Sequence, residues 1–221
     1  MAIRQCYIAS NTHVETNDIE FKFYSGFAPS QKQKCIRSLH ETIVDTQEVT
    51  KEQLLEVSSK SEDPLGVALS AFNLSTNTLK HGTKYTVESA FQSSKVFEGN
   101  IQYRDIISLD SKSAKTDPRI RNSGKLSHFQ FFDYRFELSD GTAFYDWLYI
   151  NVLLQNPDLC DKVMKYRAFT DIEFNSQKSM NTQAFAIALY VSLKLADIDM
   201  SVLKDPDSFI ETTFPFYNKF I

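Results

Sequence analysis

The segment from Tyr85 to Phe97 (YTVESAFQSSKVF) constrains the fold of this chain most, because it combines a helical apolar pattern with a row of polar side chains. Glu88, Gln92 and Lys95 follow one another at helical spacing, which would place them on one face of a helix. Apolar and small residues occupy the adjoining face, which suits burial. The row is either a solvated helix face with a weak charge pair or the floor of a catalytic pocket.

The chain is long enough for a sizeable core. It has 221 residues, 42% of them hydrophobic, and we expect them to form one compact domain. The 18 Phe and 10 Tyr residues predict an aromatic core and leave rings for stacking on a planar ligand.

The net charge of −4 argues against a general nucleic-acid binder, whose affinity depends on a basic surface. One segment is nevertheless positive, and it is either a local basic groove or a solvated loop. Its cations are Lys112, Lys115, Arg119, Arg121 and Lys125, against the single acid Asp117.

Several classes of protein are disfavoured by the sequence. Cys6, Cys35 and Cys160 lie far apart without ligand spacing, which predicts neither a disulfide framework nor a zinc site. The N-terminus lacks an apolar signal region, and no apolar run reaches the ~18 residues of a membrane span. Glycine-rich phosphate loops and the GxSxG motif are absent from the sequence. We therefore expect a cytoplasmic protein without a membrane segment, metal or cofactor.

The N-terminal third alternates between strand and helix signals. Residues 1–28 show the apolar–polar alternation of strands and are expected to form a β-hairpin. Ser30 precedes a helical pattern over residues 31–46. A short amphipathic helix is expected within residues 47–63, and a buried strand or extended segment over Val67–Leu74. Thr83 or Thr86 then caps the helix that carries Glu88.

The remaining two thirds contain the most apolar segments. The aromatic run Phe129–Leu138 has strand character, and Thr142 precedes a strongly apolar helix over residues 143–156. Further helices are expected from Pro157 to Tyr166 and over residues 183–196, the latter capped by Ser179 or Asn181. We predict an α+β fold, mostly helical, with a small antiparallel sheet built from the N-terminal hairpin and the strand at 129–138.

Three acids stand in apolar surroundings. Asp146 lies in the middle of the apolar helix, and Asp171 and Glu173 alternate in the extended segment AFTDIEFN at residues 168–175. A buried acid is costly unless it is paired or used, and alternation would place Asp171 and Glu173 on one side.

The motif YTVESAFQSSK resembles the signature of the NADAR family, a helix of the type Y-P-T-V-E-H-A-F-Q-A-x-K followed by an A-K-x-x-x-R element. Ala114, Lys115 and Arg119 fit the second element, and the segment Ser70-Ala71-Phe72 is similar to the family's upstream S-N-F. Ser89 stands where the family usually has His. The wider pattern, over most of the chain, resembles NADAR-type antitoxins associated with DarT-type toxins.

The resemblance implies an N-glycosidase that removes ADP-ribose from guanine in DNA. Lys95 would engage the anomeric carbon of the ribose as a Schiff base, and Glu88 would assist ring opening and proton transfer. The substrate would be ADP-ribosylated DNA, the product ADP-ribose, and the functional partner a DarT-type toxin. Residues 1–65 would form a family-specific hairpin and helices packed on a catalytic core at residues 66–221.

The residues themselves are consistent with this chemistry. A lysine beside a carboxylate in an apolar pocket can capture an anomeric carbon and move protons. Desolvation would lower the pKa of Lys95, whereas a nearby Glu88 would raise it. Trp147 or Phe131 is the candidate for stacking on the base. The candidate substrate-binding residues are Gln92, Phe72, Asn73, Lys115, Arg119, Trp147, Asp146, Asp171, Glu173 and Asn181.

Each secondary candidate also has a structural interpretation. Trp147 would equally serve as a core aromatic residue, and the acids as partners of Lys115, Arg119 or Arg121. Two other functions also stay open: an N-glycosidase acting on a small phosphoribosyl metabolite of the riboflavin pathway, and an inactive module that binds ADP-ribose or the toxin. A positive surface near the pocket would favour DNA over a metabolite.

Overall fold

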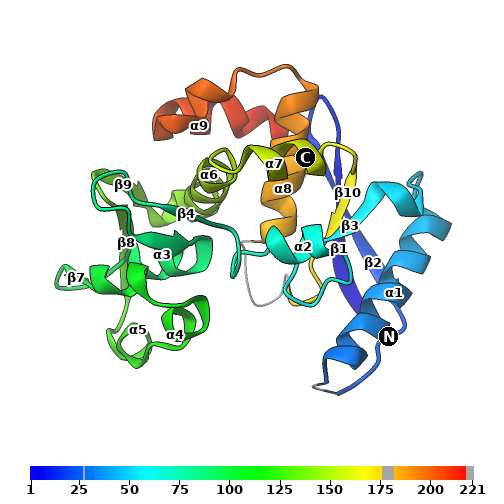
Figure 1. The fold of residues 1–221 in the computed structure, drawn as a ribbon, viewed down its shortest axis with the longest axis horizontal. Coiled ribbons are helices and arrows are strands. Elements are labelled where there is room, and N and C mark those ends of the chain that lie inside the picture. The colour runs from blue at the N-terminus through cyan, green and yellow to red at the C-terminus, as the bar shows by residue number, and fades with distance from the viewer. Residues whose placement is uncertain (27, 176–181, 218–221) are drawn as a thin grey trace.

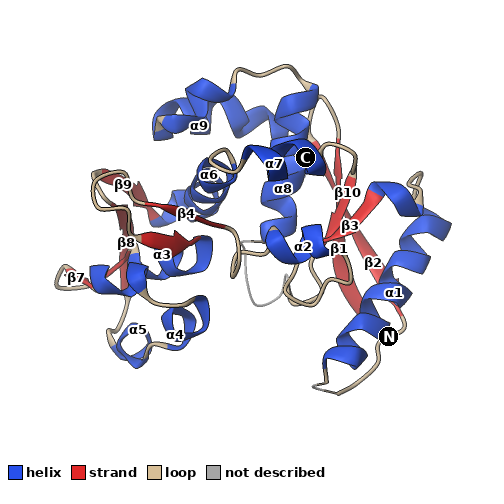
Figure 2. Cartoon of the chain, viewed as in Figure 1, coloured by secondary structure: helices blue, strands red, loops and turns tan. Residues whose placement is uncertain are grey.

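One mixed sheet joins the N-terminal hairpin to residues from far along the chain (Figures 1 and 2). The computed structural model describes residues 1–26, 28–175 and 182–217. In this sheet the strand order is β2-β1-β10-β3, with β10 antiparallel to β1 and parallel to β3. The strands are β1 (Ala2–Ala9), β2 (Val14–Phe21), β3 (Leu54–Glu56) and β10 (Ala168–Thr170).

Alternation along these strands gives the sheet two buried faces, because successive side chains point to opposite sides. Cys6, Leu54 and Ala168 pack with helix α1 (Pro29–Thr46). Their neighbours in sequence, including Leu55 and Phe169, belong instead to the main core beneath helix α8 (Gln183–Leu195). Helices therefore cover both faces, which permits the short parallel pair of β3 and β10.

A second sheet lies apart from the first, on the opposite side of the molecule in Figure 1. Its order is β7-β6-β8-β9, and every pairing in it is antiparallel. The aromatic run at 129–138 forms β8 and β9 here, so the expectation that it pairs with the N-terminal hairpin is wrong. The strands are β6 (Lys95–Phe97), β7 (Ile101–Gln102), β8 (Leu126–Phe131) and β9 (Tyr134–Glu137).

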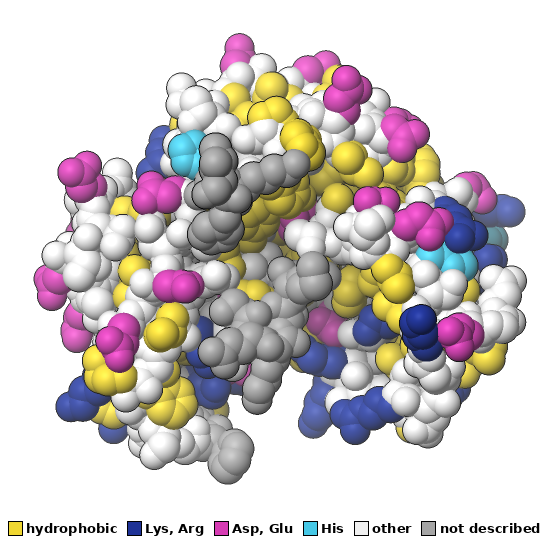
Figure 3. Space-filling model, turned by 180° about the vertical axis from the view of Figure 1, so that it is seen from behind, with side chains coloured by type: hydrophobic (Ala, Val, Ile, Leu, Met, Phe, Trp, Pro, Cys, Tyr) yellow, Lys and Arg dark blue, Asp and Glu magenta, His cyan; other side chains and the backbone are white. Residues whose placement is uncertain are grey.

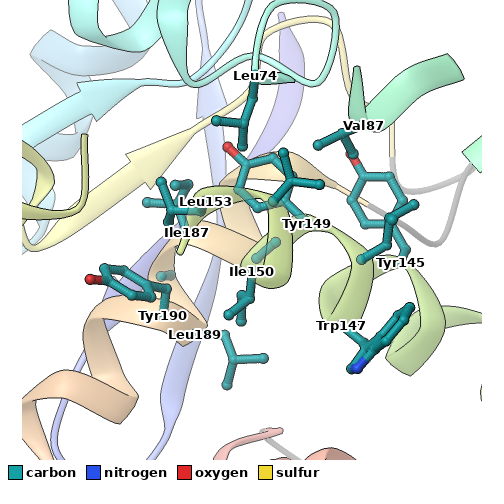
Figure 4. Packing of buried hydrophobic residues seen from close by; sticks show 14 of the residues in the cluster. Leu74, Val87, Tyr145, Trp147, Tyr149, Ile150, Leu153, Ile187, Leu189 and Tyr190 are labelled. Carbon is teal, nitrogen blue, oxygen red and sulfur yellow. The ribbon is translucent and has the colours of Figure 1, made fainter. Parts of the chain in front are cut away.

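Helices α6 (Gly141–Leu153) and α8 connect the two sheets. Both are almost wholly buried, as their apolar sequences predict, and they pack against each other (Figure 4). Helix α6 also contacts α3 (Val87–Ser93) and β9 in the part of the molecule built around the second sheet. The α+β fold class predicted from the sequence is confirmed. Among the described residues, no helix combines the length and apolar character that a bilayer crossing needs.

Two local predictions are wrong. Residues 47–63 contain a 3-10 turn and strand β3 instead of an amphipathic helix. Val67–Leu74, expected to be extended, begins in helix α2 (Pro64–Ala68) and continues in turns. Short apolar runs do not separate a strand from a buried helix by periodicity alone, and here Asp63 and Pro64 start the helix.

Helix boundaries differ from prediction by a few residues. Helix α1 starts at Pro29 after Ala28, α6 starts at Gly141 and α8 is capped by Thr182. Of the two caps predicted for α3, Thr83 and Thr86, the structure shows Thr86. The proposed caps Ser179 and Asn181 lie outside the described residues. The remaining elements are β4 (Ser75–Asn77), β5 (Lys84–Thr86), α4 (Ser111–Thr116), α5 (Pro118–Asn122), α7 (Pro157–Val163), α9 (Pro206–Thr213) and 3-10 turns at Lys51–Gln53, Arg104–Ser108, Leu138–Asp140, Met200–Lys204 and Phe214–Phe216.

Gly66 fixes how α2 packs against the turn that follows β3. A Cβ atom at this position would lie 1.9 Å from the carbonyl oxygen of Glu56 and 2.5 Å from Oγ of Ser61. Backbone atoms cannot yield as a flexible side chain can, so only glycine fits.

We expect Gly66→Ala to lower the free energy of unfolding by about 1–3 kcal/mol, measured by urea denaturation. Gly141→Ala is the matched control, because its Cβ atom would lie 3.3 Å from a ring carbon of Phe129, a contact that small shifts relieve. Equal stability of the two variants would show that the turn after β3 is not tightly held.

Candidate functional site

A cavity with a volume of about 530 Å³ lies between the two sheet-bearing parts of the molecule. Such a volume suits a ligand of nucleotide size. One wall comes from α3, α4 and the loop at residues 70–72, and the other from residues 58–60, 171–175 and 182–183. Figure 3 shows a notch between these two parts of the surface. The cavity is therefore lined by residues that lie far apart in the sequence.

Glu88, Gln92 and Lys95 form a hydrogen-bonded chain beside this cavity. Nζ of Lys95 donates to Oε1 of Gln92 at 2.8 Å, and Nε2 of Gln92 donates to Oε1 of Glu88 at 2.8 Å. The helix ends at Ser93 and Lys95 begins β6, so the prediction of one continuous helix is wrong. The side chains still meet because the long lysine reaches back over the last helical turn.

The start of α3 is fixed by side chains that cap it. Oγ1 of Thr86 accepts from the backbone N–H of Ser89, whose own hydroxyl donates to the carbonyl of Ile107 at 3.0 Å. Ser89, which stands at the position usually held by His, is thus a fully buried capping residue. This cap places the buried carboxylate of Glu88 in the first turn, where the helix dipole favours negative charge.

Lys95 lies at the edge of the cavity and not on its lining. It is half-buried, and its Nζ lies 5.1 Å from the centre of the Phe91 ring, which does line the cavity. Burial lowers the pKa of Lys95; the charge of Glu88 opposes this, and the charge of Lys115 adds to it. Desolvation is the dominant cause, which answers a question that the sequence left open.

Lys115 and Phe72 lie together on the same wall. Nζ of Lys115 is 5.0 Å from the centre of the Phe72 ring, and both side chains line the cavity. Helix α4 is held to this loop because the hydroxyl of Ser111 donates to the carbonyl of Phe72 at 2.8 Å. The cation and the ring are thus placed beside one another by a short, direct link.

Asp171 and Glu173 both line the opposite wall. The strand ends at Thr170, and a turn follows in which Oδ1 of Asp171 accepts from the backbone N–H of Glu173 at 3.0 Å. Burial raises the pKa of Asp171. Glu173 is more exposed and pairs with Lys32 at 3.0 Å.

A second buried acid supports this wall from behind. Glu56 accepts from the hydroxyl of Thr170 at 2.6 Å and from the backbone N–H of Ile172 at 2.9 Å. Burial raises its pKa, and the nearby charge of Asp171 adds to the effect. His40 contacts the same threonine at 2.9 Å, and burial lowers its pKa to about 4, so it is neutral at physiological pH.

Asp146 and Trp147 lie away from the cavity. The hydroxyl of Tyr217 donates to Oδ2 of Asp146 at 2.8 Å, and burial raises the pKa of Asp146 to about 8. Trp147 donates to the carbonyl of Lys204 at 3.1 Å and packs against Phe136. Figure 4 shows Trp147 and Tyr145, two residues apart, on different sides of α6, and Tyr145 lines the cavity.

Two further candidates make other contacts. Nδ2 of Asn73 donates to the carbonyl of Val67 and to Oγ of Ser70, each at 2.9 Å. Arg119 forms ion pairs with Asp105 at 2.8 Å and Asp117 at 2.7 Å, outside the cavity.

Phe131 packs edge-on against Trp147 in the aromatic core. Asn181 lies outside the described residues.

Sequence reasoning missed several residues of the cavity. Gln183 accepts from the backbone N–H of Ala71 at 2.6 Å and donates to the carbonyl of Val57 at 2.6 Å, so the first residue of α8 joins the two walls. Lys60 and Tyr145 also line the cavity. Their sequence context carried no signal, because a turn lysine and a helical tyrosine become site residues only through long-range packing. Among the described residues, no cluster of three or more potential ligands could hold a metal ion.

Fold and site together define a class: an α+β protein whose ligand-sized cavity lies between two sheets and has a largely buried carboxylate–amide–amine chain at its edge. The family model of the DarT1-associated NADAR antitoxin matches residues 2–219, so the chain belongs to this family. The resemblance suggested by the sequence motifs is confirmed. A search of curated proteins finds no match to the chain.

Asp146 offers a test of the structural assignment. Its raised pKa means that the folded state holds a proton that the unfolded state releases near pH 4, so wild-type stability falls from pH 4 to about pH 8. Asp146→Asn keeps an acceptor for Tyr217 and removes this titration. We expect it to be more stable than wild type by at least about 1 kcal/mol at pH 8.5, with the difference vanishing near pH 4 in urea titrations. A pH-independent difference would contradict a buried, protonated Asp146.

Proposed function

We propose that this antitoxin is an N-glycosidase that releases ADP-ribose from guanine in DNA. The observation that carries the proposal is the chain of hydrogen bonds from Lys95 through Gln92 to Glu88 at the edge of a nucleotide-sized cavity. Such a chain combines a nucleophilic amine with a carboxylate that can move protons. On an ordinary surface helix these polar side chains would point into solvent.

The reaction follows from these groups. With the ribose ring open, the neutral amine of Lys95 forms a bond to the anomeric carbon, and the guanine amino group leaves with a proton. Water then hydrolyses the resulting imine, so that ADP-ribose and free lysine are regenerated. Glu88 accepts and returns the protons that ring opening and departure of the base require. The lowered pKa of Lys95 increases the fraction of neutral amine.

The amine has a short path to the substrate. It contacts both Phe91 and Gln92, which line the cavity, and the lysine side chain has four rotatable bonds. Catalytic contacts often tighten only when substrate is bound. A rotation of Lys95 past Gln92 would bring Nζ to the anomeric carbon.

The other cavity residues suit recognition of the ADP-ribosyl group. Asp171 and Glu173 present carboxyl oxygens to ribose hydroxyls or to the guanine edge, and Phe72 offers a ring face for stacking. We also propose that residues 1–65 belong to the catalytic unit. Lys60, which lies in that segment, lines the same cavity as Glu88.

Helices α4 and α5 favour DNA over a small metabolite as the substrate. Lys112, Arg121 and Lys125 are exposed, and none forms an ion pair with another described residue. Figure 3 shows Lys and Arg side chains gathered at the rim of the notch. Because Lys115 of α4 lines the cavity, this basic surface is continuous with it. Phosphate contacts there would position a strand whose modified base enters the cavity.

The biological role follows from the family. An antitoxin that reverses the modification made by a DarT1-type toxin restores the DNA directly. We propose that this protein acts in the cytoplasm. The alternatives are an N-glycosidase acting on a phosphoribosyl metabolite and an inactive ADP-ribose- or toxin-binding module. The buried Glu88–Gln92–Lys95 chain argues against a mere binding module, and the basic surface argues against a metabolite.

The first test is release of ADP-ribose from an oligonucleotide that carries ADP-ribosylated guanosine. We expect turnover by wild type and a loss of at least about 1,000-fold for both Lys95→Ala and Lys95→Arg, because arginine keeps the charge but not the nucleophilic amine. Lys80→Ala, an exposed lysine away from the cavity, is the control and keeps full activity. If Lys95→Arg retained activity, the proposed Schiff-base step would be wrong.

The basic surface is tested with two substrates. We expect the triple variant Lys112→Gln, Arg121→Gln and Lys125→Gln to raise KM for the modified oligonucleotide about 10-fold at low salt, with a shallower salt dependence. KM for the ADP-ribosylated mononucleoside should be unchanged.

Neutralising Lys162, Lys194 and Lys204, which are exposed on other helices and turns, is the control and should leave both values unchanged. An equal effect of the two triple variants would mean that only net charge matters.

A further inference from the structure

Two lysines from different parts of the chain line the cavity on opposite walls. Lys115 comes from α4, and Lys60 comes from the turn that follows β3. Within residues 1–26, 28–175 and 182–217, neither forms an ion pair. Neither ammonium group is neutralised by an ion pair, so each can contact an anionic group of a ligand.

The turn that carries Lys60 is held in place from several sides. The backbone N–H of Lys60 donates to Oγ of Ser58 at 3.2 Å, and the backbone N–H of Ser61 donates to the carbonyl of Ser58 at 3.1 Å. Gln183 holds the preceding carbonyl of Val57, and Gly66 leaves no free space behind the turn. A turn fixed in this way can present a side chain at a defined place.

Among the described residues, none of the acids that line the cavity forms an ion pair with Lys60 or Lys115. Glu173 is already paired with Lys32 at 3.0 Å. Burial raises the pKa of Asp171, so a part of this group is protonated near neutral pH. The positive charges of Lys60 and Lys115 therefore stay available to a ligand.

We propose that Lys60 and Lys115 form a clamp across the cavity for the pyrophosphate of the ADP-ribosyl group. The inference rests on the proposed function and adds a binding residue, Lys60, and the part of the substrate that it holds. Lysine ammonium groups are common phosphate ligands, and two of them on facing walls match two linked phosphates.

The position of Lys115 agrees with this assignment. Its charge is close enough to lower the pKa of Lys95, so a phosphate bound at Lys115 lies near the reaction centre. In ADP-ribose the pyrophosphate is attached to the same ribose that bears the reacting carbon. The ring of Phe72, whose centre lies 5.0 Å from Nζ of Lys115, bounds the subsite on one side.

The clamp predicts selectivity for a diphosphate. A ligand with the pyrophosphate gains both ammonium contacts, whereas a nucleoside gains neither. Each contact of a charged hydrogen bond to phosphate corresponds to roughly 10-fold or more in affinity.

The test is isothermal titration calorimetry with ADP-ribose and with adenosine as probes, on wild type, Lys60→Gln and Lys115→Gln. We expect each variant to weaken ADP-ribose binding about 10-fold at low salt, and the double variant to weaken it further. Adenosine affinity should stay within about twofold of wild type throughout. Lys51→Gln, at an exposed lysine before β3, is the matched control and should bind as wild type does.

Three results would overturn the clamp: ADP-ribose affinity unchanged in Lys60→Gln, equal losses for ADP-ribose and adenosine, or no binding of ADP-ribose to wild type. The measurement is independent of turnover. If ADP-ribose binding depends on Lys60 while no ADP-ribosylated oligonucleotide is cleaved, the glycosidase proposal fails and the clamp stands.

Discussion

The candidate site of this protein depends above all on one interaction, the partial burial of the Lys95 amine against Phe91. Removing an ammonium group from water is costly, and the protein offsets the cost through Gln92, which links the amine to the carboxylate of Glu88. The same burial lowers the pKa of the amine, which favours the nucleophilic role that we propose for it. In the proposed mechanism, this single arrangement supplies the amine, its proton acceptor and the apolar wall.

The cavity exists only because distant segments meet. Strand β10 pairs with β1 and β3, which places Asp171 beside the turn that follows β3. The first residue of α8, Gln183, then bridges that wall to the loop at residues 70–72. Helices α6 and α8 hold the two sheets at a fixed separation by packing together in the core (Figure 4). One set of contacts therefore positions both walls, to which we assign recognition and chemistry in the proposed reaction.

The sequence predicted what local patterns determine. Apolar runs marked α6 and α8, and Thr86 with the helical spacing of Glu88 and Gln92 marked the wall formed by α3. It did not predict the pairing of β10 with β3, because strands more than a hundred residues apart carry no register signal. For the same reason Lys60 and Gln183 were missed. Asp146 attracted attention as a buried acid, but its partner, Tyr217, belongs to the C-terminal tail and could not be identified from spacing.

The proposed mechanism requires a covalent bond between Lys95 and the ribose. The most direct measurement is borohydride reduction during turnover of the ADP-ribosylated oligonucleotide, followed by peptide mass spectrometry. We expect a stable ADP-ribosyl adduct on the peptide that contains Lys95, and none on that peptide when residue 95 is arginine. Turnover without an adduct at Lys95, or an adduct confined to another lysine such as Lys115, would contradict it.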